Sequence, residues 1–298
     1  MYKDLLESEN FMQFLEKNTN LTRLKIIQIG YELQAGNYEA KYNNEATPTK
    51  KRIDILKKEI NNILKSKNTC NIIEVGIGEG NTMRHLIESL DKETLDKINF
   101  YGVELSLSRT KIAKKHLPMC NLSVADMNNL PFDDNSFDIV YTASAIEPNI
   151  DNEEIILKEL YRICKNNLIL FEISYKEASL KLRERMDKHK YVKYLYETII
   201  KLNYNLISFY ELKTTETINN YLYFIKKNDN INEESTKDNI NESPVSYISP
   251  IFNDKLDIVT YNDSKYYKSK HINLYFPIID NIPVLLIENS LIIKTPEN

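Results

Sequence analysis

Short apolar runs of strand length alternate along most of the chain with longer stretches in which apolar residues recur every three or four positions. The first pattern is typical of buried strands and the second of amphipathic helices. The strands expected from it cover residues 71–75, 98–104, 122–126, 137–143, 167–174, 205–212 and 219–227, and the helices cover 50–66, 82–90, 106–116, 152–164 and 176–203. This alternation predicts an α/β fold whose mostly parallel sheet has helices on both faces. Because only a short link joins the last two strands, we expect that pair to be antiparallel.

The same pattern divides the chain into four parts. Residues 228–245 are polar and rich in Asn, which predicts a flexible linker. Residues 246–298 return to strand-like runs and contain several prolines, which is typical of a small β-rich module. We therefore expect an N-terminal helical cap segment (1–49), an α/β domain (50–227), the linker and the C-terminal module.

Composition and charge argue against several classes of protein, among them nucleic-acid-binding, secreted and membrane-spanning proteins. The 298 residues include 39 Lys or Arg and 43 Asp or Glu, so the net charge is −4, whereas a nucleic-acid surface usually shows a basic excess. No signal-peptide core and no apolar run long enough to cross a bilayer is evident. The three cysteines, Cys70, Cys120 and Cys164, lie far apart, which argues against a disulfide framework or a cysteine zinc site. We expect a soluble cytoplasmic protein with neither a nucleic-acid nor a membrane partner.

Glycine is scarce, yet half of it is concentrated in one place. The chain has six glycines, and Gly76, Gly78 and Gly80 fall within five positions where a predicted strand becomes a helix. Glycines there let the backbone approach a ligand closely, next to the free N–H groups of a helix start. The loop lacks the Gly-Lys-Ser/Thr ending of a P-loop, and Asn81 stands where the dinucleotide fingerprint has its third glycine.

With Glu74, these glycines form the spacing E-x-G-x-G-x-G, which resembles the first motif of the class I S-adenosylmethionine-dependent methyltransferases. Further motifs of that family follow in order: Glu104-Leu105 at the end of the second strand, Asp126-Met127 after the third, and an LPF…SFDIV run over 130–140. The resemblance covers about residues 50–227 and implies a Rossmann-like methyltransferase sheet. It also implies S-adenosylmethionine as cofactor, S-adenosylhomocysteine (SAH) as product, and no metal.

The resemblance assigns roles to these residues. Glu104 would accept hydrogen bonds from the ribose hydroxyls, and Asp126 would meet the adenine amino group while the backbone of Met127 reads a ring nitrogen. Glu74, Leu105 and the three glycines complete the expected cofactor site.

The acceptor side is less well marked. Ligands of such folds bind at the carboxyl edge of the sheet, which points to Glu147 and Tyr175 as catalytic candidates. Many relatives carry Glu-His where this chain has Glu147-Pro148, so the common histidine base is absent. His189 could contribute from a lid formed by the region after 176, or lie on the surface. An upstream segment often covers the donor in this family, and here Tyr31, Gln34 and Tyr38 are the candidates; a plain helix–loop joint is the alternative.

The C-terminal module has a resemblance of its own. Its YFPIIDNIPVLL run (275–286) is similar to the end of the zinc-ribbon activator subunit of tRNA and translation-factor methyltransferases. At its start, however, Ser249 and Phe252 replace the two cysteines, and without thiolates we expect no zinc site. The module is then expected to dock on the methyltransferase domain or to join two chains in a homodimer.

These observations lead to one preferred function and two alternatives. The preferred function is methyl transfer by in-line displacement to a small-molecule, metabolite or polysaccharide-precursor acceptor. The alternatives are a non-catalytic cofactor-binding scaffold or regulatory protein, and an RNA or protein methyltransferase, the last suggested by the kinship of the module alone.

Overall fold

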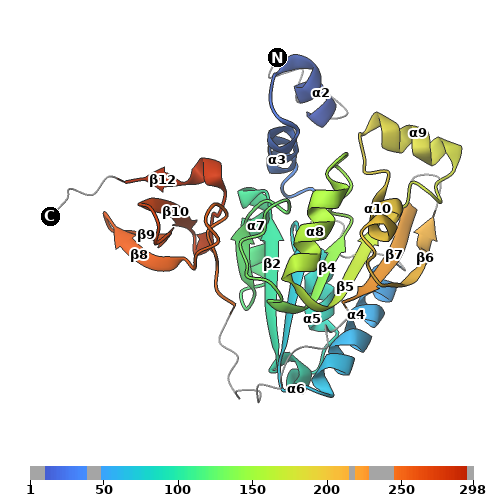
Figure 1. Ribbon diagram of the computed structural model, residues 1–298, viewed down its shortest axis with the longest axis horizontal. Helices are drawn as coiled ribbons and strands as arrows, with labels where there is room; N and C mark the ends of the chain where they lie inside the picture. The colour runs from blue at the N-terminus through green and yellow to red at the C-terminus, as the bar shows by residue number, and fades with distance from the viewer. Residues whose placement is uncertain (1–10, 39–47, 215–218, 228–244, 294–298) are drawn as a thin grey trace.

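The computed structural model describes residues 11–38, 48–214, 219–227 and 245–293. Within these residues, a large α/β domain stands beside a small β module at the C-terminal end of the chain (Figure 1). The predicted linker lies outside the described residues except for Val245.

Seven strands form the sheet of the α/β domain, in the order β3-β2-β1-β4-β5-β7-β6. Their bounds are β1 Cys70–Val75, β2 Ile98–Glu104, β3 Asn121–Val124, β4 Phe137–Ala143, β5 Cys164–Glu172, β6 Leu206–Thr214 and β7 Asn219–Lys226. Strand β7 pairs antiparallel with both β5 and β6, while the other neighbours pair in parallel. The predicted mostly parallel sheet with an antiparallel pair at its end is confirmed.

The strand order places the ligand site. The chain runs outward from β1 through β2 to β3, then returns to the other side of β1 with β4. Open α/β sheets bind ligands outside the carboxyl ends of the strands at such a reversal. Here that point lies between β1 and β4, directly after Val75, where the glycine cluster begins.

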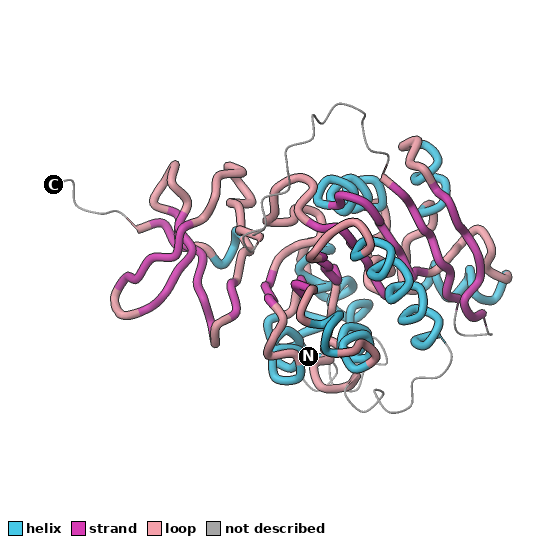
Figure 2. The backbone as a smooth tube through the Cα atoms, turned by 90° about the horizontal axis from the view of Figure 1, so that it is seen from below, coloured by secondary structure: helices cyan, strands magenta, loops and turns pink. Residues whose placement is uncertain are grey.

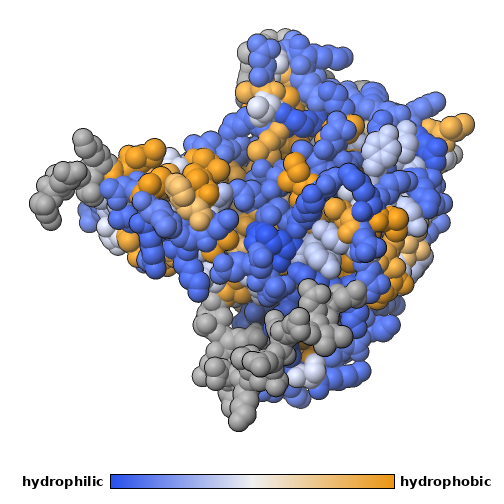
Figure 3. Space-filling model, in the orientation of Figure 1, coloured by the Kyte–Doolittle hydropathy of each residue, from blue (hydrophilic) through white to orange (hydrophobic). Residues whose placement is uncertain are grey.

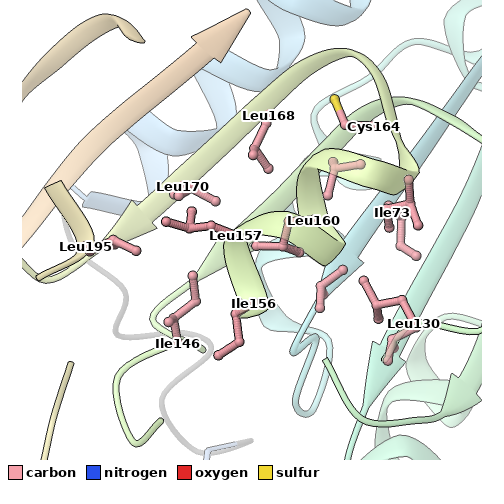
Figure 4. Packing of buried hydrophobic residues seen from close by; sticks show 14 of the residues in the cluster. Ile73, Leu130, Ile146, Ile156, Leu157, Leu160, Cys164, Leu168, Leu170 and Leu195 are labelled. Atoms are coloured by element: carbon pink, nitrogen blue, oxygen red, sulfur yellow. The ribbon is translucent and has the colours of Figure 1, made fainter. Parts of the chain in front are cut away.

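Helices cover both faces of the sheet, as Figure 1 shows. Apolar residues of α4 (Pro48–Leu64), α5 (Asn81–Glu88) and α7 (Leu107–His116) pack on one face. Those of α8 (Glu153–Ile163), α9 (Leu180–Lys188) and α10 (Leu195–Lys201) pack on the other. Figure 4 shows how Ile156, Leu157 and Leu160 of α8 lie over Leu168 and Leu170 of β5. Burying these side chains stabilises the fold by about 2 kcal/mol for each one.

The long helical stretch predicted over 176–203 is helical in two separate parts. The region forms α9 and α10, separated by residues 189–194, where Lys190 takes a left-handed φ of 55°. Tertiary hydrogen bonds hold this break, because the backbone N–H of Val192 donates to the carbonyl of Glu147 and that of Lys193 donates to the Glu153 carboxylate. The apolar spacing continues across the break and therefore gave no sign of it.

Three short helices complete the α/β domain. The N-terminal segment contains α2 (Phe11–Asn18) and α3 (Arg23–Leu33), which agrees with the predicted helical character of residues 1–49 where these are described. A single turn, α6 (Lys92–Leu95), precedes β2 and was not predicted. No described helix has the length and apolar character needed to cross a membrane.

The C-terminal module is an antiparallel sheet in the order β11-β10-β9-β8, with β12 also paired to β10. Its strands are β8 Asp257–Tyr261, β9 Ser264–Lys268, β10 Leu274–Ile279, β11 Ile282–Pro283 and β12 Leu291–Ile292, and a 3₁₀ turn, η2, covers Ile287–Asn289. It stands to one side of the α/β domain (Figure 2). Hydrophobic residues are visible on the surface of the module (Figure 3). Among its apolar side chains, Ile258 is 59% exposed and Ile292 is 80% exposed.

The module is joined to the edge strand β3. The N–H of Leu285 donates to the carbonyl of Val124 at 2.8 Å, and Val124 forms a parallel bridge with Val284. These two valines are buried together with Ile282 and Leu286. The contact covers the free edge of β3, which would otherwise present unpaired backbone groups to other chains.

Candidate functional site

The glycine loop leaves β1 through backbone conformations that favour glycine. Gly76 and Gly78 have φ angles of 75° and 59°. A Cβ on Gly76 would clash with that of Ala145, and one on Gly78 would clash with the guanidinium of Arg109. Gly80 lies one step further on, where it caps the N-terminus of α5. The loop is thus shaped so that backbone, rather than side chains, borders the space above it.

Glu104 is held in place by the glycine loop. Its side chain is 4% exposed, and its two oxygens accept hydrogen bonds from the backbone N–H of Gly78 at 2.9 Å and of Ser106 at 3.0 Å. The Nη1 atom of Arg109 lies 3.8 Å from the same carboxylate. These contacts fix the carboxylate at the carboxyl end of β2, beside the loop.

The other two predicted acids also lie near the loop. The hydroxyl of Tyr141 donates to Glu74 at 2.8 Å, at the base of the loop. Asp126 accepts hydrogen bonds from the backbone and side-chain amides of Asn128. Burial raises the pKa of Asp126, and the donors on Asn128 act in the opposite direction.

The N-terminal segment packs over this end of the site. The guanidinium carbon of Arg109 lies 4.7 Å from the ring centre of Tyr31 and 5.0 Å from that of Tyr38, so the three side chains form a stack. The Glu32 carboxylate accepts the N–H of Leu107 at the start of α7, at 2.6 Å. The segment is therefore joined to the cofactor side through both side chains and backbone.

A cavity of about 620 Å³ opens above the glycine loop. Its lining includes all predicted cofactor residues except Gly80, namely Glu74, Gly76, Gly78, Glu104, Leu105, Asp126 and Met127. It also includes Tyr31, Tyr38 and Glu147. A volume of several hundred Å³ is typical of a small-molecule site, and the structure thus brings most of the predicted residues together.

Two carboxyl groups lie close together at the end of the cavity formed by the segment after β4, here called the far end: Glu172 is fully buried and Glu147 is half-buried. Burial, and then the neighbouring carboxyl of Glu172, raises the pKa of Glu147 to about 8. Burial also raises the pKa of Glu172 to about 7, although the N–H groups of Ala145 and Ile146 donate to it. At neutral pH Glu147 is therefore mostly protonated, and a shift of this size in a cleft is typical of functional carboxyls.

Besides Gly80, three predicted residues lie outside the cavity lining. The hydroxyl of Tyr175 donates to Asp187 at 3.3 Å, and its ring packs beneath Arg183 and Lys193. His189 ends α9 and stacks on Tyr191, which itself lines the cavity. Gln34 caps the C-terminus of α3 with its backbone. Tyr175 lies in the turn after β5, His189 at the break after α9 and Gln34 at the end of α3. The apolar pattern of the sequence did not locate any of these three points.

The structure adds residues that the sequence reasoning missed. Arg109, Arg52 and Tyr191 line the cavity, as do Lys213, Asn219 and Asn220 where β6 ends and β7 begins. Arg109 and Arg52 lie on the polar sides of helices, where a charged residue carries no distinguishing signal. The residues of β6 and β7 reach the site because an antiparallel pair returns to the carboxyl edge of the parallel strands, which could have been inferred from the predicted topology.

The part of the chain that forms the cofactor end of the cavity also matches a known protein family. Residues 73–171, a third of the chain, match the family model described as a methyltransferase domain, and they contain the glycine loop, Glu104 and Asp126. These residues therefore belong to a methyltransferase domain. The match begins in β1 and ends in β5, and so covers the parallel part of the sheet.

Curated relatives match over a similar stretch. The ubiquinone/menaquinone biosynthesis C-methyltransferases UbiE of Rhizobium rhizogenes and Agrobacterium fabrum are each 31% identical to this chain over 120 residues. That stretch is 39% of this chain and 45% of each relative, so the chain spans less than half the length of the curated relatives it matches.

Solved structures share the fold of the methyltransferase domain. Magnesium protoporphyrin IX methyltransferase from Synechocystis PCC 6803 with bound SAH superposes with a TM-score of 0.52 at 12% identity, covering 68% of this chain and 99% of that one. The same enzyme with bound SAM gives 0.51 at 10% identity, covering 70% and 98%. The Rossmann-like methyltransferase fold is thereby confirmed.

Proposed function

We propose that the protein transfers a methyl group from S-adenosylmethionine to a small-molecule acceptor. The observation that carries the proposal is one cavity whose near end is bordered by the glycine loop, Glu104 and Asp126, and whose far end is bordered by Glu147. Donor and acceptor would then meet in a single enclosed space. An in-line displacement requires such alignment together with the exclusion of water.

The residues at the near end fit the donor. Gly76 and Gly78 leave a cradle that a Cβ would fill, and the fixed Glu104 carboxylate offers acceptor oxygens beside it. Glu104 would hold the ribose hydroxyls, while Asp126 and the backbone of Met127 would hold the adenine ring. Glu74 would support the loop from below, and Leu105 would pack against the adenosine. When bound, S-adenosylmethionine supplies an electrophilic methyl group on a sulfonium centre.

The chain's own contribution to the chemistry is positioning and proton transfer. Tyr31 and Tyr38 cover the near end together with Arg109, which excludes water from it. Glu147 is the acceptor-side group that we propose as general base: its ionised form, a minority at neutral pH and the major form above a pH of about 8, is basic enough to take a proton from an acceptor hydroxyl or amine. Tyr175 and His189 are not part of this proposal, since neither lines the cavity.

Two observations favour a small-molecule acceptor: the volume of the cavity and the substrates that the names of similar proteins state. The UbiE proteins act in ubiquinone/menaquinone biosynthesis, and the Synechocystis enzyme acts on magnesium protoporphyrin IX. Both names describe the methylation of small molecules.

For the C-terminal module, we propose kinship with the zinc-ribbon activator and a role in covering the methyltransferase domain. Ser249, at the first cysteine position, accepts the N–H groups of Ile251 and Phe252 through its hydroxyl, and so closes the turn by hydrogen bonds. Among the described residues, no group of three or more His, Cys, Asp or Glu side chains is placed to hold a metal ion. The β3 edge contact supports an intramolecular docking role.

Calorimetric titration of SAH into the full chain tests the proposed donor site. We expect micromolar binding, and a loss of affinity of at least about tenfold in Glu104→Ala and Asp126→Ala, because hydrogen bonds to charged groups contribute about 1.5–3 kcal/mol each. Glu88→Ala is the matched control, since this residue lies on the exposed side of α5. A folded wild type that does not bind SAH would rule the proposal out.

A further inference from the structure

The basic side chains of the cavity fall into two groups. Arg109 lies at the near end, where Glu104 pairs with it and Glu74 and Asp126 add further acidic groups. The far end instead carries three basic side chains on three separate elements, Arg52 on α4, Arg185 on α9 and Lys213 on β6. Three elements distant in sequence thus bring positive charge to the acceptor side.

The carboxyl groups at the far end offset little of this charge at neutral pH. Burial raises the pKa of Glu147 to about 8 and that of Glu172 to about 7, so Glu147 is mostly neutral and Glu172 only partly ionised. Tyr191 also lines the cavity beside Glu147, and burial raises its pKa to about 12, so it is uncharged at neutral pH. The far end is therefore net positive.

Arg52 is held in place by a small group of polar side chains. Nη2 of Arg52 donates to the hydroxyl of Ser144 at 3.1 Å, and the amide nitrogen of Asn220 lies 3.4 Å from the same hydroxyl. Asn220 is 4% exposed, and its Oδ1 atom is buried without a hydrogen-bond partner among the described residues. A ligand O–H or N–H at this position would satisfy that oxygen.

Apolar side chains also line the cavity. Ile27, Ile173, Leu182 and Met186 line the same cavity and are almost fully buried. An apolar ligand body would pack against these side chains, and an anionic group on the same ligand would pair with the basic side chains. A polar hydrogen donor next to the anion would meet Asn220.

We propose that the methyl acceptor is a small molecule with an apolar body and an oxyanion, a carboxylate or a phosphate, bound by Arg52, Arg185 and Lys213. The inference rests on the proposed methyl-transfer function and adds the chemical class of its substrate. Lys213 is the most direct probe, because its side chain makes no hydrogen bond or ion pair with the residues that the structure describes, and its charge is thus available to a ligand.

Calorimetry on the full chain saturated with SAH tests this inference. The probes are mandelate, benzyl phosphate and the neutral mandelamide, which keeps the phenyl ring and the hydroxyl of mandelate but removes its charge. We expect at least one anion to bind about tenfold more tightly than mandelamide, because hydrogen bonds to charged groups are the stronger ones. The better of the two anions identifies the oxyanion as carboxylate or phosphate.

The variant Lys213→Gln should weaken binding of that anion about fivefold to tenfold and leave the affinity for SAH unchanged. Lys226→Gln, at the opposite and exposed end of the same hairpin, should change neither affinity. Mandelamide binding as tightly as mandelate, binding of neither anion, or anion binding unaffected by Lys213→Gln would each overturn the inference while leaving the donor site intact. Failure of SAH itself to bind would overturn the proposed function, and this inference with it.

Discussion

The guanidinium of Arg109 fills the space beside Gly78 that a Cβ at that position would need. The same guanidinium lies 3.8 Å from Glu104 and within about 5 Å of the ring centres of both Tyr31 and Tyr38. One side chain of α7 therefore connects the glycine loop, the carboxylate at the end of β2 and the N-terminal segment. Changes at any of these places should affect the others.

Gly78→Ala should weaken SAH binding by at least about tenfold, because the left-handed φ of 59° costs an alanine about 1 kcal/mol and the new methyl group displaces Arg109. Calorimetry with SAH measures the change. Gly36→Ala is the matched control, since Gly36 also has a left-handed φ but nothing within 4 Å of its Cβ. An equal loss of affinity in both variants would show that backbone strain, and not the contact with Arg109, is responsible.

Arg109→Met should release the N-terminal segment from the methyltransferase domain. The substitution keeps an unbranched apolar stem in place of that of Arg109 but removes the charge and with it two cation–π contacts, which contribute about 0.5–1 kcal/mol each. Amide hydrogen exchange in residues 31–38 should accelerate about tenfold, which mass spectrometry can follow. Lys115→Met on the exposed side of α7 should leave it unchanged. Unchanged exchange in Arg109→Met would mean that the backbone contacts alone hold the segment.

The stability of the protein should fall as the pH rises from about 5 to 8. In this window the folded protein keeps a proton on Glu147, with a pKa of about 8, which the unfolded chain releases near pH 4.5. Each such group lowers the free energy of unfolding by at most about 1.4 kcal/mol per pH unit. Glu172, with a pKa of about 7, adds to the decline in the lower part of the window.

Urea unfolding at pH 5.5, 6.5 and 7.5 measures this dependence. Glu147→Gln cannot titrate and should flatten the curve, whereas Glu184→Gln on the exposed side of α9 should not. A wild-type stability that rises with pH over this range would contradict the raised pKa values.

Val284→Asp should detach the C-terminal module from β3. Val284 is 3% exposed against Val124, and burying an unpaired carboxylate there costs about 3 kcal/mol or more. We expect faster proteolysis between the two domains and a lower melting temperature. Ile258→Asp on β8, where the side chain is 59% exposed, should behave like the wild type. A Val284→Asp protein as resistant as the wild type would show that the edge contact contributes little.

The sequence determined those features that depend on local pattern and on general rules of α/β topology. Periodicity located every strand of the large sheet to within a few residues, and alternation of strands and helices implied parallel pairing. Gly76 and Gly78 could be assigned to the site because glycine is scarce and follows the central strand. Glu104 and Asp126 were assigned to the same site by the resemblance to the class I methyltransferases, whose motifs follow the glycine loop in order.

The tertiary structure alone decided which distant side chains join that edge. Arg109 and Arg52 reach the cavity from helices, and Lys213 reaches it from β6. Their positions depend on how these elements pack together, which the spacing of apolar residues does not show. The break after His189 and the pairing of Leu285 with Val124 likewise depend on hydrogen bonds between segments far apart in the chain. The spacing of apolar residues shows which face of a helix or strand is buried, but it does not show which other segment packs against that face. The acceptor side of this site is formed by side chains from such packed segments, so only the tertiary structure could locate it.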